Sequence, residues 1–294
     1  AWGEHEMRRG RISVDSQPID VDGDGDLDVM GGSRGEQRVF WFENISQGAS
    51  DIRFREHRIE ISGGGDQAPR VTGFNLDYAD LNGDGRLDVA LRDGPNGVVW
   101  LAQPEDPAAA WTRHVIGDIP PEVLIGFALA DIDNDGDSDL VVGAYSQGDR
   151  ARDAETYPEA AGGRLAWFEN PGDATASWTR HDFSRRARGM FDKFIPRDMD
   201  GDGDLDIVAA IWNGDTVIWY EHDGNADPTW TPVEITADVN GAWEIDVGDM
   251  DGDGDLVLDQ QRRVHFGPRR VGHQSLGAQR APCLFREMRH HRRH

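Results

Sequence analysis

The sequence predicts an all-β fold, a β-propeller built from four-stranded blades. Three observations indicate this fold: an aspartate-rich motif recurs five times, a β-branched run follows each of the first four copies, and a tryptophan-containing strand follows each run. The copies begin at Asp20, Asp80, Asp131, Asp198 and Asp249. A period of about 50–60 residues with turn signals between short strands is typical of propeller blades.

Each unit contains four short segments with strand character. In the first unit, the β-branched run at 27–30 precedes the aromatic run at 39–43, and a fourth segment follows at 54–59. A further apolar segment precedes the motif, most clearly at 127–130. Four strands per unit give blades at about 10–60, 70–117, 121–184 and 189–237.

The two ends of the chain together predict a fifth blade. Residues 2–7 match the pattern of the fourth strand, yet they precede the first motif. We therefore expect the N-terminal strand, within residues 1–8, to close a last blade whose other strands come from 242–256 onward. Such an exchange protects the edges of a circular sheet array. Residues 1–256 then form one propeller domain with five detectable blades.

The last segment, 257–294, has a different composition and is predicted to be an atypical basic tail. The fifth motif breaks at Val257, where aspartate is expected, and only Asp259 and Glu287 are acidic from there on. Lys193 is the only lysine of the whole chain. The strong preference for arginine over lysine indicates a GC-rich coding sequence. In a GC-rich gene, an out-of-frame reading gives a sequence rich in arginine, histidine and proline, so we interpret the tail as the result of a frameshift near residue 256. The alternative is a native basic tail that folds over the acidic body.

The spacing within the motif predicts calcium loops. Oxygens at loop positions 1, 3, 5 and 9 converge when a glycine at position 6 permits a sharp turn, and a hard cation with six to eight oxygen ligands, Ca²⁺, suits them. Position 7 contributes its backbone carbonyl, since an arginine side chain occupies it in loop two. The predicted metal residues are Asp20, Asp22, Asp24, Asp26 and Asp28; Asp80, Asn82, Asp84, Arg86 and Asp88; Asp131, Asp133, Asp135, Asp137 and Asp139; Asp198, Asp200, Asp202, Asp204 and Asp206; and, in the broken fifth loop, Asp249, Asp251, Asp253 and Asp255. The alternative, ordinary solvated turns, is disfavoured by four copies in one register.

The composition of the chain disfavours several kinds of binding partner. The 294 residues carry a formal net charge of −25, which disfavours nucleic acid because phosphates would be repelled. The longest apolar run, 123–130, is far shorter than the ~20 residues that span a membrane. The single cysteine, Cys283, excludes an internal disulfide. We expect a monomer without a membrane span.

Two residue series recur at fixed places in the blades. His57, His114 and His181 share one register, and each unit also carries a tryptophan in its third strand. Recurrence in successive blades favours a structural role for both series over a shared catalytic or metal site.

The motif Asp-x-Asp-x-Asp-Gly-x-x-Asp with its following strands resembles the FG-GAP/VCBS-type repeat, which is also found in integrin α-subunit heads. It is present in loops one, three and four, and in loop two with Asn82 at the third position. The resemblance covers residues 1–256 and implies a calcium-loop propeller. Such propellers usually have seven blades, so a chain with five is expected to be truncated. Members of this group include adhesion modules, lectins and polysaccharide lyases, so the resemblance leaves the activity open.

Two functions remain open at this stage. The first is a secreted binding or adhesion module for glycans or protein, placed outside the cell because such loops bind calcium with ~10⁻⁴–10⁻³ M affinity in extracellular modules. The second is a lyase acting on uronate-containing polysaccharide. A lyase needs a base, for which Tyr145 or Tyr157 is the candidate, and an arginine to neutralise developing charge, for which Arg150 or Arg188 is the candidate.

Overall fold

The computed structural model describes most of the repeat region and only β-strands as regular elements there. The described residues are 16–33, 36–48, 51–63, 71–120, 123–145, 165–184, 191–211, 216–236, 242–248 and 257–262. In this part of the chain no helix has the length and apolarity to cross a membrane. The predicted all-β class is confirmed.

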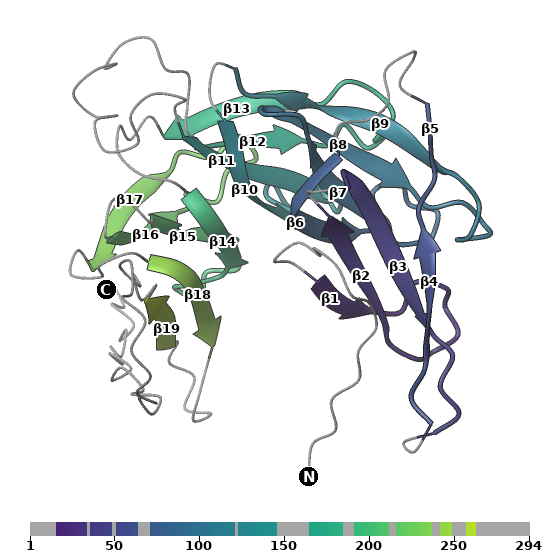
Figure 1. Ribbon diagram of the computed structural model, residues 1–294. Coiled ribbons are helices and arrows are strands. Elements are labelled where there is room, and N and C mark those ends of the chain that lie inside the picture. Colours follow the sequence, from purple (N-terminus) through teal and green to yellow (C-terminus); the bar gives the residue numbers. More distant parts are fainter. Residues whose placement is uncertain are drawn as a thin grey trace, which may run out of the picture.

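The strands form five sheets, and successive strands pair antiparallel (Figure 1). Sheet I contains β1 (Ser16–Ile19), β2 (Asp28–Ser33), β3 (Arg38–Asn44) and β4 (Phe54–Arg58). Sheet II contains β6 (Val71–Ala79), β7 (Asp88–Asp93), β8 (Gly97–Ala102) and β9 (Trp111–Asp118). Sheet III contains β10 (Val123–Ala130), β11 (Asp139–Tyr145), β12 (Leu165–Glu169) and β13 (Thr179–Ser184). Sheet IV contains β14 (Phe191–Arg197), β15 (Asp206–Ile211), β16 (Thr216–Glu221) and β17 (Thr231–Thr236), and sheet V contains β18 (Ala242–Gly248) and β19 (Val257–Arg262).

The sheets follow one another along an arc, as the blades of a propeller do (Figure 1). The first strands β6, β10, β14 and β18 lie next to one another in this order, and sheet I joins the row through contacts of β2 with β6. The strand predicted at 2–7 lies outside the described residues. Ring closure, the number of blades and the domain boundaries therefore stay predictions.

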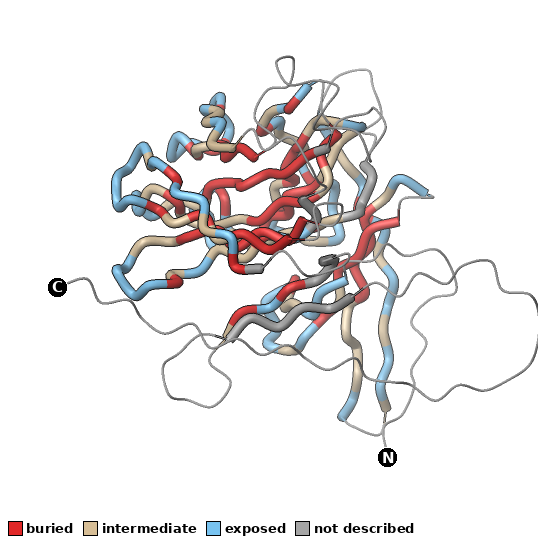
Figure 2. Tube along the Cα trace, turned by 90° about the vertical axis from the view of Figure 1, so that its left-hand side faces the viewer, coloured by how far each residue is buried: buried red, intermediate tan, exposed pale blue. Residues whose placement is uncertain are grey.

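The core lies between the sheets, because the middle strands bury both faces. In β7, Val89 and Leu91 pack in the cluster shared with sheet I, whereas Ala90 packs in the cluster shared with sheet III. This alternation follows from the two-residue period of a strand. Figure 2 shows such buried strands gathered in the interior of the molecule. Trp41 and Trp100 belong to the same clusters, which confirms their structural role.

The recurrent histidines stack on the recurrent tryptophans across strands three and four. The ring centroids are 4.3 Å apart for Trp41 and His57, 4.4 Å for Trp100 and His114, and 4.4 Å for Trp167 and His181. The two rings of each pair are nearly parallel, and they belong to directly opposite residues of the two strands. The predicted structural role of these histidines is confirmed.

Two strands differ from the predicted four-stranded unit. The short strand β5 (Ile61–Ser62) runs parallel to β9 and extends sheet II beyond its fourth strand. It covers an edge that would otherwise present unpaired backbone groups. The second strand of sheet V, β19, lies within the segment assigned to the basic tail. The remainder of that tail, 263–294, lies outside the described residues.

The contact between sheets II and III gives a test of the packing. A Cβ atom added at Gly117 would lie 2.3 Å from Cε1 of the buried Phe168 ring. We expect Gly117→Ala to lower the free energy of unfolding by about 1–3 kcal/mol, because a ring in a packed core has no room to move. Urea denaturation measures this change.

The matched control is Gly248→Ala, because no atom of the described residues lies within 4 Å of a Cβ added there. Equal urea midpoints for Gly117→Ala and the parent protein would show that sheets II and III are packed more loosely than described.

Candidate metal centre

The aspartate-rich loops connect the first strand of each sheet to the second. They occupy residues 20–27 in sheet I, 80–87 in sheet II, 131–138 in sheet III and 198–205 in sheet IV. The glycine at position 6 has a left-handed backbone in every one of them, as the turn requires: φ is +93° at Gly25, +82° at Gly85, +98° at Gly136 and +102° at Gly203.

Position 4 is left-handed as well, which the sequence analysis did not predict. Glycine occupies it in three loops, and Asn134 occupies it in the third loop with φ of 60°. Asparagine tolerates this region better than most residues, which explains the exchange. Each loop thus contains two left-handed residues that bend it around its first aspartate.

The first carboxylate of each loop is the centre of that bend. Its Oδ2 accepts the backbone N–H of position 6, at 3.1 Å between Asp20 and Gly25 and at 2.8 Å between Asp80 and Gly85. The third and fourth loops repeat this bond at 3.1 Å. A carboxylate offers about four lone-pair sites, so the first residue keeps acceptor capacity for a cation.

In three loops the carboxylates of positions 1, 3 and 9 converge. One oxygen from each lies within 4.8 Å of the others, and the groups are Asp20, Asp22 and Asp28; Asp131, Asp133 and Asp139; and Asp198, Asp200 and Asp206. The donors are oxygens only, a set that suits hard cations such as Ca²⁺ better than zinc or copper. The residues therefore fit a hard divalent metal ion.

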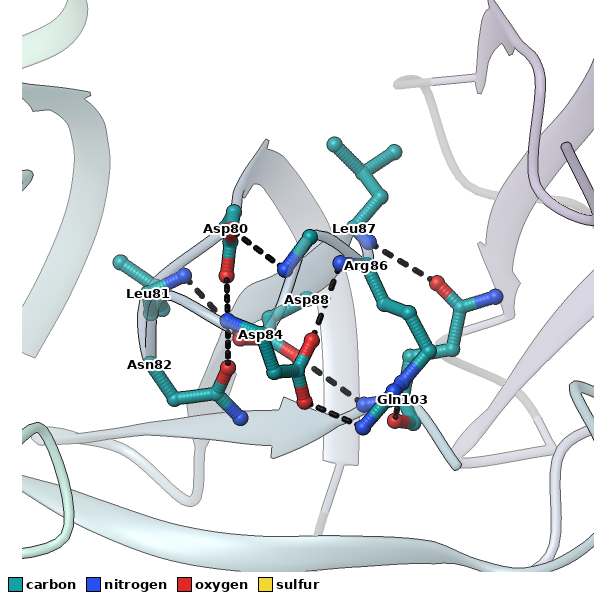
Figure 3. A network of polar contacts seen from close by, with 9 residues as sticks. Asp80, Leu81, Asn82, Asp84, Arg86, Leu87, Asp88 and Gln103 are labelled. Carbon is teal, nitrogen blue, oxygen red and sulfur yellow. Dashed lines mark hydrogen bonds and ion pairs between the residues drawn. The ribbon is translucent and has the colours of Figure 1, made fainter. Parts of the chain in front are cut away.

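Loop two has the same backbone arrangement with fewer carboxylates (Figure 3). Asn82 replaces the third aspartate, and its Oδ1 accepts the N–H of Asp84 at 3.0 Å. Asp80 and Asp88 remain at the first and ninth positions.

The carboxylates of position 5 do not belong to the converging groups. Instead, Oδ1 of this residue accepts the N–H of position 7, at 2.9 Å between Asp24 and Asp26 and at 2.9 Å between Asp84 and Arg86. In loop two the Arg86 side chain pairs with the carboxylate of Asp84. Metal ligation by positions 5 and 7 stays a prediction.

The aspartate at position 9 has a structural role that the sequence analysis missed. Asp28, Asp88, Asp139 and Asp206 are at most 1% exposed. Oδ2 of each accepts the N–H of loop position 2, and Oδ1 accepts the N–H of the residue that follows the third strand or ends it. For Asp139 these donors are Ile132 and Asn170, both at 2.8 Å. The available signal was the polar residue three positions after the tryptophan of the third strand: Asn44, Gln103, Asn170 and His222.

Burial raises the pKa of three of these aspartates. Desolvation raises the pKa of Asp88 and of Asp206 to about 6 and the pKa of Asp139 to about 7. Burial, assisted by neighbouring carboxylates, also raises the pKa of Asp22, Asp133 and Asp200 at position 3. A bound cation would favour the charged forms and oppose these shifts.

Side chains of one sheet also reach the loop of the sheet before it. Gln103 Nε2 donates to the carbonyl of Val21 at 2.6 Å, and Asn170 Nδ2 donates to the carbonyl of Leu81 at 3.3 Å. Between loops three and four, Asn134 Nδ2 donates to Asp204 Oδ1 at 2.8 Å. The loops are therefore joined to one another through hydrogen bonds between sheets.

The structure does not test the predicted catalytic candidates, so their role stays a prediction. Tyr145 ends β11. Tyr157, Arg150 and Arg188 lie outside the described residues, as do Asp249, Asp251, Asp253 and Asp255 of the fifth loop.

Successive four-stranded sheets, each with an aspartate-rich turn between its first two strands, define a propeller-like repeat protein with candidate metal-binding loops. The profile of the FG-GAP-like repeat matches residues 20–91, 80–142 and 198–258, which together exceed half of the chain. The chain belongs to this family. A search of curated proteins found no match.

Three solved structures with some similarity are carbohydrate-related enzymes by name. A bifunctional GH43-CE protein of Bacteroides eggerthii has a TM-score of 0.39 at 11% identity, and the match covers 82% of this chain and 33% of that one. The PQQ-bound aldose sugar dehydrogenase of Streptomyces coelicolor has a TM-score of 0.33 at 11% identity, with 86% and 95% covered. An oxidoreductase of Thermus thermophilus, described as a glucose dehydrogenase, has a TM-score of 0.30 at 14% identity, with 83% and 92% covered. This chain spans a third of the length of the first of them, and at this similarity no activity transfers.

The buried aspartates predict an inverted pH dependence for the metal-free protein. Asp88, Asp139 and Asp206 have folded pKa values of about 6, 7 and 6, above the ordinary 3.8. Between pH 4 and pH 7 the folded state therefore binds more protons than the unfolded state, and stability is lost as the pH rises. We expect the free energy of unfolding in EDTA to fall by about 5 kcal/mol from pH 5 to pH 8, the sum over the three groups. Urea denaturation at each pH measures it.

Asp139→Asn is the matched variant, because an amide does not titrate. Its pH slope is expected to be shallower than that of the parent, whatever its absolute stability. An unchanged slope, or a parent protein that gains stability toward pH 8 in EDTA, would contradict the assignment.

Proposed function

We propose that the aspartate-rich loops bind Ca²⁺ and that the protein is a secreted, calcium-stiffened propeller that serves as a binding or adhesion module for glycans or protein. The observation that supports this most directly is the recurrence of the same three-carboxylate group in sheets I, III and IV. Ordinary turns have no reason to repeat such a repulsive arrangement at one place.

The residues at positions 1, 3 and 9 would hold the ion, and the ion would supply positive charge between them. Four bound ions carry eight positive charges and would bring the formal net charge from −25 to about −17. Because position 9 also bonds the end of the third strand, an ion held there would stiffen the loop and the sheet together.

The proposed location outside the cell follows from the calcium affinity that such loops have. Calcium sites of extracellular modules have dissociation constants of ~10⁻⁴–10⁻³ M, far above the free calcium of the cytosol. Loops of this kind would be filled outside the cell and empty inside it. The family membership is consistent with a secreted protein.

The proposed binding role rests on the positions of the loops at the two ends of each sheet. The metal loops occupy one end of each sheet, which leaves the loops at the other end free to vary on a rigid scaffold. The sequence places Arg150 and Arg188 in those opposite loops, and guanidinium groups grip carboxylate and sulfate groups bidentately. We therefore propose acidic glycans as the first ligands to test.

Calcium is expected to raise the free energy of unfolding. At about 5 mM calcium, each site with a dissociation constant of ~10⁻⁴–10⁻³ M contributes about 1–2 kcal/mol by mass action. Asp200→Ala is expected to remove the contribution of one site. Thermal melts with and without calcium, together with metal counting on the same sample, measure both effects.

The control for charge is Asp118→Asn, an exposed aspartate at the end of β9. It should leave the calcium-dependent stabilisation unchanged. A protein whose melting temperature is the same in calcium and in EDTA would refute the proposed role of the loops.

Binding to acidic glycans is expected to depend on calcium, because the ion stiffens the scaffold that presents the opposite loops. A glycan array probed in calcium and again in EDTA measures this, with neutral glycans as the control. Equal signals from acidic and neutral glycans would reject the preference for acidic ligands, and no signal with any glycan would reject the glycan-binding role; both results leave calcium binding intact.

A further inference from the structure

Loop two differs from its counterparts at position 7. The residue there is Arg86, whereas the other complete loops have Asp26, Asp137 and Asp204. The same loop has Asn82 in place of the third aspartate. Its fold is nevertheless the same, because Asp80 accepts the Gly85 N–H as in the other loops.

The Arg86 side chain is held at two points beside the loop. Its Nη2 forms an ion pair with Oδ2 of Asp84, and its Nε donates to the backbone carbonyl of Gln103 at 2.9 Å. Gln103 in turn accepts the Leu87 N–H through Oε1 at 3.0 Å. Figure 3 shows the guanidinium lying between Asp84 and Gln103. A positive group is thus fixed within the carboxylate loop.

The formal charges of the loops differ accordingly. Positions 1, 3, 5, 7 and 9 carry five aspartates in loops one, three and four, a formal charge of −5. In loop two they carry three aspartates, one asparagine and one arginine, a formal charge of −2. Affinity of calcium loops is tuned by the number of charged ligands, so this difference acts directly on binding.

We propose that Arg86 is a built-in counter-ion, which makes loop two the weakest calcium site of the four and makes its stability depend less on bound metal than that of the other loops. The inference rests on the proposed calcium function. In loops one, three and four the repulsion between carboxylates is relieved by calcium; in loop two a guanidinium of the same chain relieves it. All four loops have the same backbone bonds, so the difference lies in the charge that remains without metal: loop two has its own counter-charge, and the other three loops have none at this position.

A reciprocal exchange tests the proposal. Arg86→Asp is expected to tighten calcium binding at loop two by about tenfold, because two unit charges change within a few ångströms of the site. Asp26→Arg is expected to weaken loop one by a similar factor. Calorimetric titration of the full chain with calcium alone counts tight sites: one more than the parent for Arg86→Asp, and one fewer for Asp26→Arg.

Two further variants keep the test decisive. Arg86→Gln removes the positive charge without adding a carboxylate, and it should tighten loop two by less than Arg86→Asp does. Asp80→Asn should leave the number of tight sites unchanged, since loop two is not among them. Melting in EDTA adds a second measurement: Arg86→Asp should melt below the parent there, and calcium should restore the difference.

The outcomes distinguish a failure of the inference about Arg86 from a failure of the proposed calcium binding. A parent protein that binds calcium with equal affinity in all four loops, or an Asp80→Asn variant that loses a tight site, overturns the inference and leaves the proposed function standing. An Arg86→Asp variant with unchanged calcium affinity and an unchanged melting temperature in EDTA also overturns the inference about Arg86 and leaves the proposed function standing. A parent protein that binds no calcium overturns both.

Discussion

One buried aspartate in each repeat holds the loop, the second strand and the end of the third strand in fixed relation. Asp28, Asp88, Asp139 and Asp206 open the second strand, and both oxygens of each accept backbone N–H groups. Burying a carboxylate is costly unless its hydrogen bonds are made, so this position tolerates few alternatives. In the fifth repeat Val257 stands there, and a valine side chain accepts no such bonds.

The same aspartates connect the metal loops to the packing of the sheets. Gln103 and Asn170 each donate a backbone N–H to the aspartate of their own sheet, and each donates a side-chain N–H to the loop of the sheet before it. The apolar clusters between sheets bury both faces of the middle strands and add a second kind of contact between neighbouring sheets. A change in one loop is therefore expected to alter the hydrogen bonds of the neighbouring sheet.

The loops are formed by backbone hydrogen bonds before any ion is considered. Carboxylates of positions 1, 3 and 5 accept N–H groups within their own loops, so the turn is defined by the chain itself. The residual problem is electrostatic: three carboxylates lie within 4.8 Å of one another. In loop two an arginine side chain offsets part of this charge, and in our proposal calcium does so in the other loops.

The sequence by itself determined the repeat, the all-β class, the glycine turns and the structural role of the histidines. These properties are local or periodic, so spacing and residue type are enough to predict them. Only the tertiary structure decided which oxygens converge, because positions 1, 3 and 9 meet while position 5 turns to a backbone N–H. It also showed the added strand β5 and the bonds of Gln103 and Asn170 to the preceding sheet. Those contacts join residues 49 to 89 positions apart, a separation at which no local pattern specifies a partner.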